Sequence, residues 1–140
     1  AAAVTDKVNF SAFVPPRVSP GQEFAVNVWA YLKQQREEML EEARSMGEVS
    51  EAGKKNALSV VRGSTVTVVL DVPRDRLRVL GEASDEIEWD GEVANAAFDL
   101  QCLPSCPRGR VACAAYIKRE GGAKMARLSF GVTVEAGGVA

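Results

Sequence analysis

The sequence predicts a mainly β protein: an Ig-like antiparallel β-sandwich of about seven strands, with one amphipathic helix inserted after the second strand. Two observations carry this prediction. Short segments with strand-like alternation, separated by proline and glycine turn signals, recur along most of the chain. Only residues 32–46 have helical periodicity, uninterrupted by glycine or proline. The 140 residues suit a single domain, 1–140, with a substantial core.

The first two strands are predicted at residues 7–13 and 23–31, where alternate side chains are apolar. In the second strand, the alternation puts Trp29 and Tyr31 on the face opposite the valines. An aromatic pair on that face indicates that it is covered as well. We expect the helix to be the element that covers it.

The helix predicted at about 32–46 has an apolar stripe and an acidic ridge. The stripe is Leu32, Met39, Ala43 and Met46, and the acidic ridge is Glu37, Glu38, Glu41 and Glu42. Gly47 supplies a stop, because glycine readily takes the left-handed conformation that ends helices. The ridge is a candidate contact for a basic protein partner. The alternative is that the helix only closes one face of the sandwich and the ridge is simply solvated.

The remaining strands follow turn and alternation signals. They are predicted at residues 57–62, 64–72, 77–80, 86–89, 93–102, 110–118 and 124–134. The segment 64–72 is the clearest, because β-branched side chains dominate it. Asp90-Gly91 is a hairpin signal, so we expect 93–102 to pair back on 86–89.

Three stretches are predicted to lie outside the regular elements. Residues 47–56 are polar and rich in Glu, Lys and Gly, which indicates a surface connection. Glu120-Gly121-Gly122 predicts a tight turn, and residues 135–140 predict a flexible tail. The chain opens with alanines rather than methionine, so we expect a piece of a longer protein or a processed or tagged chain.

Charge and composition exclude several classes of function. The formal net charge is −2, which argues against nonspecific nucleic-acid binding, since that needs a basic surface. No apolar run is long enough to cross a membrane. The chain has no histidine, which excludes Ser-His-Asp and Cys-His catalysis and histidine metal sites. A phosphate-binding P-loop motif is also missing.

Cys102, Cys106 and Cys113 are the three cysteines. An odd number fits a secreted disulfide framework poorly, so we expect a cytoplasmic domain. Structural zinc requires four ligands, and three thiols without histidine predict no metal and no cofactor. We expect Cys102 and Cys113 to be core residues on neighbouring strands, because free cysteine is often buried. Cys106, in a loop, is expected to be exposed and reactive.

Two charged clusters remain as candidate sites. Arg74, Arg76 and Arg78 share strand parity and predict a basic face that holds a small anion or an acidic partner; the alternative is a solvated strand edge guarded by charge. Asp85, Glu86, Glu88, Asp90 and Glu92 crowd the predicted hairpin. Paired carboxylates serve glycosidases, but charges around a solvent-exposed turn are common. We therefore expect no catalytic residues and no enzyme activity.

Several sequence blocks carry a resemblance. They are Phe10-Ser11-Ala12-Phe13, Pro20-Gly21 with Val28-Trp29-Ala30-Tyr31, Arg62-Gly63-Ser64-Thr65-Val66-Thr67-Val68, Trp89-Asp90-Gly91 with Ala96 and Phe98, and Leu128-Ser129-Phe130. In this order they resemble a prokaryotic β-sandwich accessory domain found in multidomain proteins with TIR-type or similar signalling or conflict-system domains. The chain departs from that domain at residues 102–106. None of the blocks is a catalytic signature.

The resemblance implies an accessory module beside an effector. We therefore expect a non-catalytic protein-interaction or regulatory module of a larger bacterial signalling or defence protein. Its expected partners are other domains of the same chain or a signalling protein, with a second copy of the chain as a further candidate. The alternative is a β-sandwich that binds a small anion or other ligand on its basic face.

Overall fold

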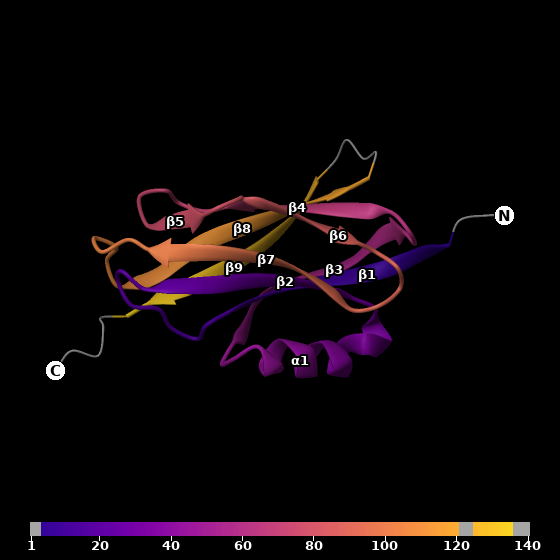
Figure 1. Ribbon diagram of the computed structural model, residues 1–140, viewed down its shortest axis with the longest axis horizontal. Helices are drawn as coiled ribbons and strands as arrows, with labels where there is room; N and C mark the ends of the chain where they lie inside the picture. The colour runs from indigo at the N-terminus through magenta and orange to yellow at the C-terminus, as the bar shows by residue number, and fades with distance from the viewer. Residues whose placement is uncertain (1–3, 121–124, 136–140) are drawn as a thin grey trace.

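The computed structural model describes residues 4–120 and 125–135 (Figure 1). Within them the chain is mainly β, with two antiparallel sheets packed face to face and one helix on the outside. This confirms the predicted two-layer β architecture with a helix after the second strand. The predicted flexible tail beyond residue 135 and the glycines of the predicted turn at 120–122 lie outside the described residues.

The described residues form nine strands and a short helical segment. The strands are β1 (Thr5–Val14), β2 (Glu23–Tyr31), β3 (Ser50–Val61), β4 (Thr65–Asp71), β5 (Leu77–Leu80), β6 (Ser84–Glu88), β7 (Ala94–Cys102), β8 (Gly109–Arg119) and β9 (Met125–Val134). A 3₁₀ turn η1 (Lys33–Gln35) leads into helix α1 (Arg36–Ser45). The five-stranded sheet has the order β3-β1-β2-β7-β5, and the four-stranded sheet has the order β6-β4-β8-β9.

The predicted surface connection at residues 47–56 is wrong. Most of it belongs to β3, which runs from Ser50 to Val61 and pairs with the whole of β1. β3 lies at the edge of its sheet, and many of its side chains are exposed. The polar composition of β3 is therefore a consequence of its exposed position and does not indicate a loop. Two register shifts against β1 also interrupt the alternation of apolar and polar side chains by which a strand is recognised in a sequence.

The predicted hairpin between 86–89 and 93–102 is also wrong. β6 pairs with β4, whereas β7 pairs with β2 and β5 in the other sheet. Asp90-Gly91 therefore links the two sheets. Trp89 explains the difference: it is fully buried, and its backbone bonds to Gly63 and Ser64 hold the end of β6 beside β4. The chain leaves this point towards the five-stranded sheet.

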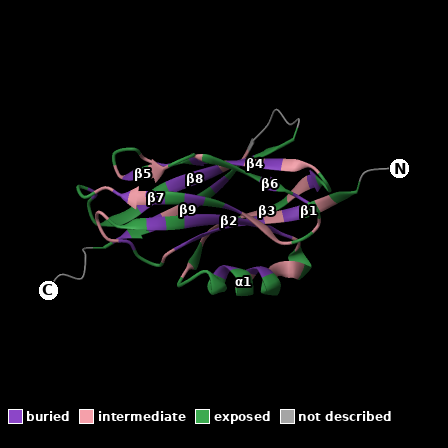
Figure 2. Cartoon of the chain, in the orientation of Figure 1, coloured by how far each residue is buried: buried purple, intermediate pink, exposed green. Residues whose placement is uncertain are grey.

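The main core fills the space between the sheets, and a smaller second core lies under α1 (Figure 2). The second core contains Phe13, Trp29, Tyr31, Met39 and Ala43. This confirms that the outer aromatic face of β2 is covered by the helix. The predicted inward position of Met46 is wrong, because α1 ends at Ser45 and the Met46 residue is 56% exposed.

One side of the sandwich is closed by close contact between β3 and β9. Gly53 of β3 lies directly against the β9 backbone: a Cβ at this position would overlap the carbonyl oxygen of Ser129 and lie 2.8 Å from the Cβ of Phe130. Only glycine permits this approach. The opposite side is bounded by the two shortest strands, β5 and β6.

Candidate functional site

Helix α1 is held on the five-stranded sheet by an apolar anchor and a polar one. Met39 and Ala43 supply the apolar anchor within the second core. Arg36 supplies the polar anchor: its Nη1 donates to the Tyr31 hydroxyl (3.0 Å), and its two Nη atoms donate to the Glu51 carboxylate (2.9 and 3.1 Å). The buried Ser11 Oγ lies 2.7 Å from the Tyr31 hydroxyl oxygen. These bonds tie the start of the helix to β1, β2 and β3.

Within the polar anchor, each charged group stabilises the charged form of the other. The Arg36 guanidinium lowers the pKa of Glu51, against the opposing effect of partial burial, and Glu51 in turn raises the pKa of Arg36. The Arg36 side chain is only 35% exposed and the Glu51 side chain only 25%. A bidentate pair of this kind fixes orientation as well as distance. The helix therefore has one defined position on the sheet.

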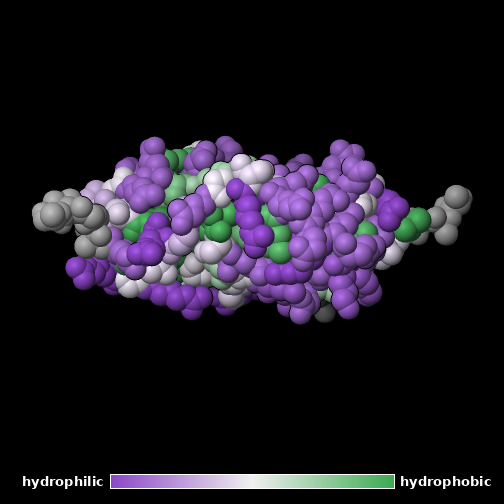
Figure 3. Space-filling model, turned by 90° about the horizontal axis from the view of Figure 1, so that it is seen from below, coloured by the Kyte–Doolittle hydropathy of each residue, from purple (hydrophilic) through white to green (hydrophobic). Residues whose placement is uncertain are grey.

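The four residues of the acidic ridge are all exposed on α1, as the sequence places them. None of them forms an ion pair among the residues that the structure describes. Hydrophilic side chains gather over the helix on this face of the molecule (Figure 3). The structure thus brings the ridge together as one unpaired negative surface.

The three arginines of the predicted basic face do not lie on one strand face. Only Arg78 belongs to β5. Arg74 and Arg76 lie in the preceding turn, which is closed by bonds from the backbone of Arg76 and Leu77 to the Pro73 carbonyl. Strand parity therefore does not extend back to them. The Arg76 guanidinium lies 3.9 Å from Asp75.

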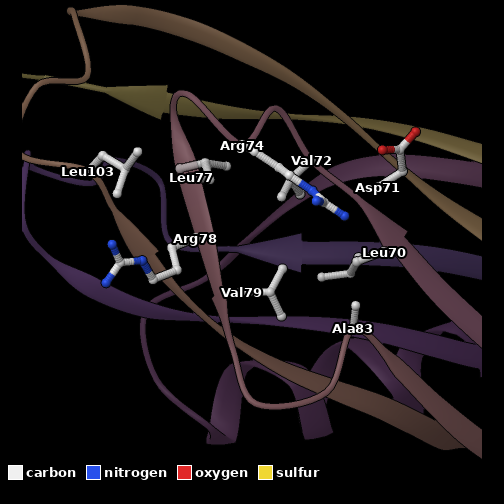
Figure 4. Close-up of a pocket in the computed structure, with 9 residues that line it drawn as sticks. All are labelled: Leu70, Asp71, Val72, Arg74, Leu77, Arg78, Val79, Ala83 and Leu103. Carbon is white, nitrogen blue, oxygen red and sulfur yellow. The ribbon is translucent and has the colours of Figure 1, made fainter.

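A groove opens where β4 ends beside β5. It has a volume of about 420 Å³ and is lined by Leu70, Asp71, Val72, Arg74, Leu77, Arg78, Val79, Ala83 and Leu103. Figure 4 shows the Arg74 guanidinium on the same side of β5 as Val79 and Leu70, whereas the Arg78 side chain extends to the other side. Two of the predicted arginines therefore line this groove, and Arg74 is the one that lies on the side of Leu70 and Val79.

All three cysteines are buried. Burial confirms the expectation for Cys102 and Cys113, although β7 and β8 belong to different sheets and are not neighbouring strands. The expectation that Cys106 is exposed is wrong: its amide bonds to the Leu103 carbonyl (2.9 Å), and this turn folds the side chain inward. Burial raises the pKa of Cys102 to about 11 and that of Cys113 to about 12, with Cys106 and Asp71 respectively adding to the effect.

We expect all three thiols to react slowly with an alkylating reagent in the folded protein. Both burial and, for Cys102 and Cys113, a raised pKa suppress the reactive thiolate. Mass spectrometry should show each native cysteine modified at least about a hundredfold more slowly than in denaturant. A Ser105→Cys variant is the control, since Ser105 is exposed in the same loop and its thiol should react quickly. Rapid native labelling of Cys106 would disprove the inward turn.

The carboxylates around Asp90 have local structural roles. Asp85 accepts hydrogen bonds from the amides of Glu86 and Ala97, and Asp90 accepts one from the amide of Glu92. All five carboxylate residues of this cluster are exposed. Among the described residues no group of three or more Cys, Asp or Glu side chains is placed to hold a metal ion.

Two polar networks were not found from the sequence. One is the Arg36 anchor described above. In the other, Asp6 accepts bonds from both Arg62 (2.9 and 3.0 Å) and the buried Trp89 indole (2.9 Å), and these partners lower its pKa. The partners lie far apart in the chain, so no local spacing signals them. Both networks hold the fold together.

Comparison with known proteins yields no match, either to a protein-family profile or to a curated protein. In the described part of the chain no helix has the length and apolar character needed to cross a membrane.

Proposed function

We propose that this domain is a non-catalytic protein-interaction module whose acidic ridge contacts a basic surface of its partner. The observation that carries the proposal is that the four ridge glutamates lie without ion-pair partners in the described chain on a helix that is fixed in place. Helix α1 is fixed by Met39, Ala43 and the Arg36–Glu51 pair, yet the ridge has no ion pair within the described chain. A surface that is already ordered loses little conformational entropy on binding.

The topology explains the presence of a long connection but not its charge. β2 and β3 both pair with β1, on its two sides, so the chain must cross β1 between them. Helix α1 makes that crossing on the outer face of the sheet (Figure 1). A neutral polar surface would serve this purpose equally well. Four clustered negative charges instead attract a positively charged partner and speed its encounter with the helix.

The context of the module is part of the same proposal. The resemblance to accessory sandwich domains supports an Ig-like module in a larger bacterial signalling or defence protein, working in the cytoplasm. Its partner is another domain of that protein, a signalling protein or a second copy of the chain. The partner surface must be basic, because the ridge is acidic and already ordered.

Reversal of all four ridge glutamates to lysine tests the proposal. The melting temperature should fall by only a few degrees, because exposed charges contribute little to stability and the largest cost is that of lysines at positions 37 and 38 in the first turn of α1. Binding to the remainder of the full-length protein, supplied as a separate chain, should weaken at least about tenfold at low salt. Added salt should weaken wild-type binding in the same direction.

A matched control reverses four exposed carboxylates elsewhere. Asp75, Glu82, Glu86 and Glu88 are all exposed and lie between the end of β4 and the end of β6, outside α1 and the core beneath it. Their reversal changes the net charge equally, so it should alter binding by less than about twofold if contact is local to the ridge. Equal loss in both variants would show that only net charge matters, and no loss in the ridge variant would show the ridge to be a solvated surface.

A second candidate function, binding of a small anion, is favoured by one specific observation. Arg74 lies over a groove that is otherwise walled mainly by apolar side chains. This replaces the predicted basic face of three arginines with two arginines at one concave site. A concave site is the usual setting for a small ligand.

A further inference from the structure

The groove exists because the two sides of the sandwich end differently. On one side, Gly53 lets β3 close against β9. On the other, β6 stops pairing with β4 at Val69, where Ser84 is its last partner. Beyond that point β4 continues to Asp71 with only one bond, from the Leu70 amide to the Ala83 carbonyl (2.7 Å), linking it to the β5–β6 connection. The interior is therefore open beside β5.

The walls of the groove are suited to an apolar molecule. Six of the nine lining residues are apolar: Leu70, Val72, Leu77, Val79, Ala83 and Leu103. Its volume of about 420 Å³ lies within the range of about 300–1,000 Å³ that is typical of small-molecule sites. With each water-sized unit taking about 30 Å³, a ligand of roughly a dozen non-hydrogen atoms fits.

Two arginines line the groove, and Arg74 lies on the side of its apolar residues Leu70 and Val79, whereas Arg78 extends to the other side of β5. Asp75 is engaged by Arg76, and the Asp71 carboxylate is directed away from the Arg74 guanidinium (Figure 4). Arg74 has no ion-pair partner in the described part of the chain. A guanidinium offers a planar fork of donors that matches a carboxylate in a bidentate arrangement.

We propose that the groove binds a small monocarboxylate with an apolar body, such as a medium-chain fatty acid. The carboxylate pairs with Arg74, and the hydrocarbon body lies against Leu70, Val79 and their apolar neighbours. This inference rests on the second candidate function and specifies its ligand. An anion without an apolar body would leave the walls unused, and an apolar molecule without charge would leave Arg74 unpaired.

Calorimetric titration with three probes separates these contributions. Octanoate carries both the carboxylate and the apolar body, octanol has only the body, and acetate has only the carboxylate. We expect octanoate to bind at least about tenfold more tightly than either. In Arg74→Gln, octanoate affinity should fall to that of octanol. Arg44→Gln is the matched control and should bind like the wild type, because Arg44 is exposed on α1 and does not line the groove.

Each other outcome overturns a defined part of the proposal. If acetate binds as tightly as octanoate, and Arg74→Gln abolishes both, the small-anion function stands and the apolar-body inference fails. If octanol equals octanoate, or Arg74→Gln binds octanoate normally, anion recognition by Arg74 fails and both proposals fall. Absence of octanoate binding at about 10 mM, far weaker than a specific site requires, likewise overturns both.

Discussion

Replacement of Gly53 by alanine is expected to lower the free energy of unfolding by about 2–4 kcal/mol. The new Cβ would overlap the carbonyl oxygen of Ser129 and crowd Phe130. Both obstacles belong to β9, and a strand backbone held by its ladder to β8 cannot move aside without disturbing the sheet. Chemical denaturation with urea measures the loss directly.

Gly131→Ala is the matched control for this substitution. A Cβ at Gly131 would also overlap a neighbour, but that neighbour is the guanidinium end of Arg110. A long side chain can choose another rotamer at small cost, so the expected loss is less than about 1 kcal/mol. Equal losses in the two variants would show that β3 does not lie directly against β9.

The second large effect is expected for Met39→Asp, which should lower the free energy of unfolding by about 2–4 kcal/mol. Met39 is fully buried between α1 and the aromatic side chains of Phe13, Trp29 and Tyr31. An aspartate there removes apolar contacts and places a carboxyl group without a partner in the second core. Thermal and urea unfolding both measure the change.

Met46→Asp makes the same chemical change at an exposed residue of the same segment. Met46 follows the last turn of α1 and contributes little apolar burial. The expected loss is below about 1 kcal/mol, which allows for a negative charge near a helix C-terminus. If Met46→Asp were as damaging as Met39→Asp, the stripe inferred from helical spacing would be right and the exposed position of Met46 would be wrong.

Local patterns were sufficient for the elements whose side chains alternate or repeat regularly. β2 has the predicted bounds, and β4 differs by one residue at each end. The helical segment lies within the predicted 32–46, but its first turn is 3₁₀ and Leu32 and Met46 lie outside it. Coverage of Trp29 and Tyr31 by that helix was also predicted, because two aromatic side chains on one strand face need burial.

Local patterns did not predict which strands pair with each other in the folded protein. β3 looks like a polar loop because it is an exposed edge strand, and only its ladder with β1 defines it. Asp90-Gly91 is a residue pair that is common in hairpin turns, but the burial of Trp89 beside β4 determines where β6 lies. Cys106 was misplaced because Pro104 signals the turn but not the inward direction of the side chain that follows it.

The candidate sites divide in the same way. The four glutamates of the acidic ridge lie on one helix, so helical spacing alone predicts that they lie together. The groove depends on where β6 stops and on which side of β5 each arginine extends. The sequence pattern therefore grouped three arginines, although Arg76 does not line the groove and only Arg74 lies on the side of Leu70 and Val79. The Arg36–Glu51 anchor joins residues on two different elements, with no motif between them.

The central claim is that α1 is the surface through which this domain meets its partner. Two-dimensional amide NMR spectra of the domain, recorded while the remainder of the full-length protein is added at low salt, test this most directly. We expect the largest shift changes at the exposed positions of α1, centred on Glu38 and Glu41, and we expect high salt to reverse them. Changes confined to the β5–β6 side or to the loop at Cys106, with α1 unaffected, would contradict it.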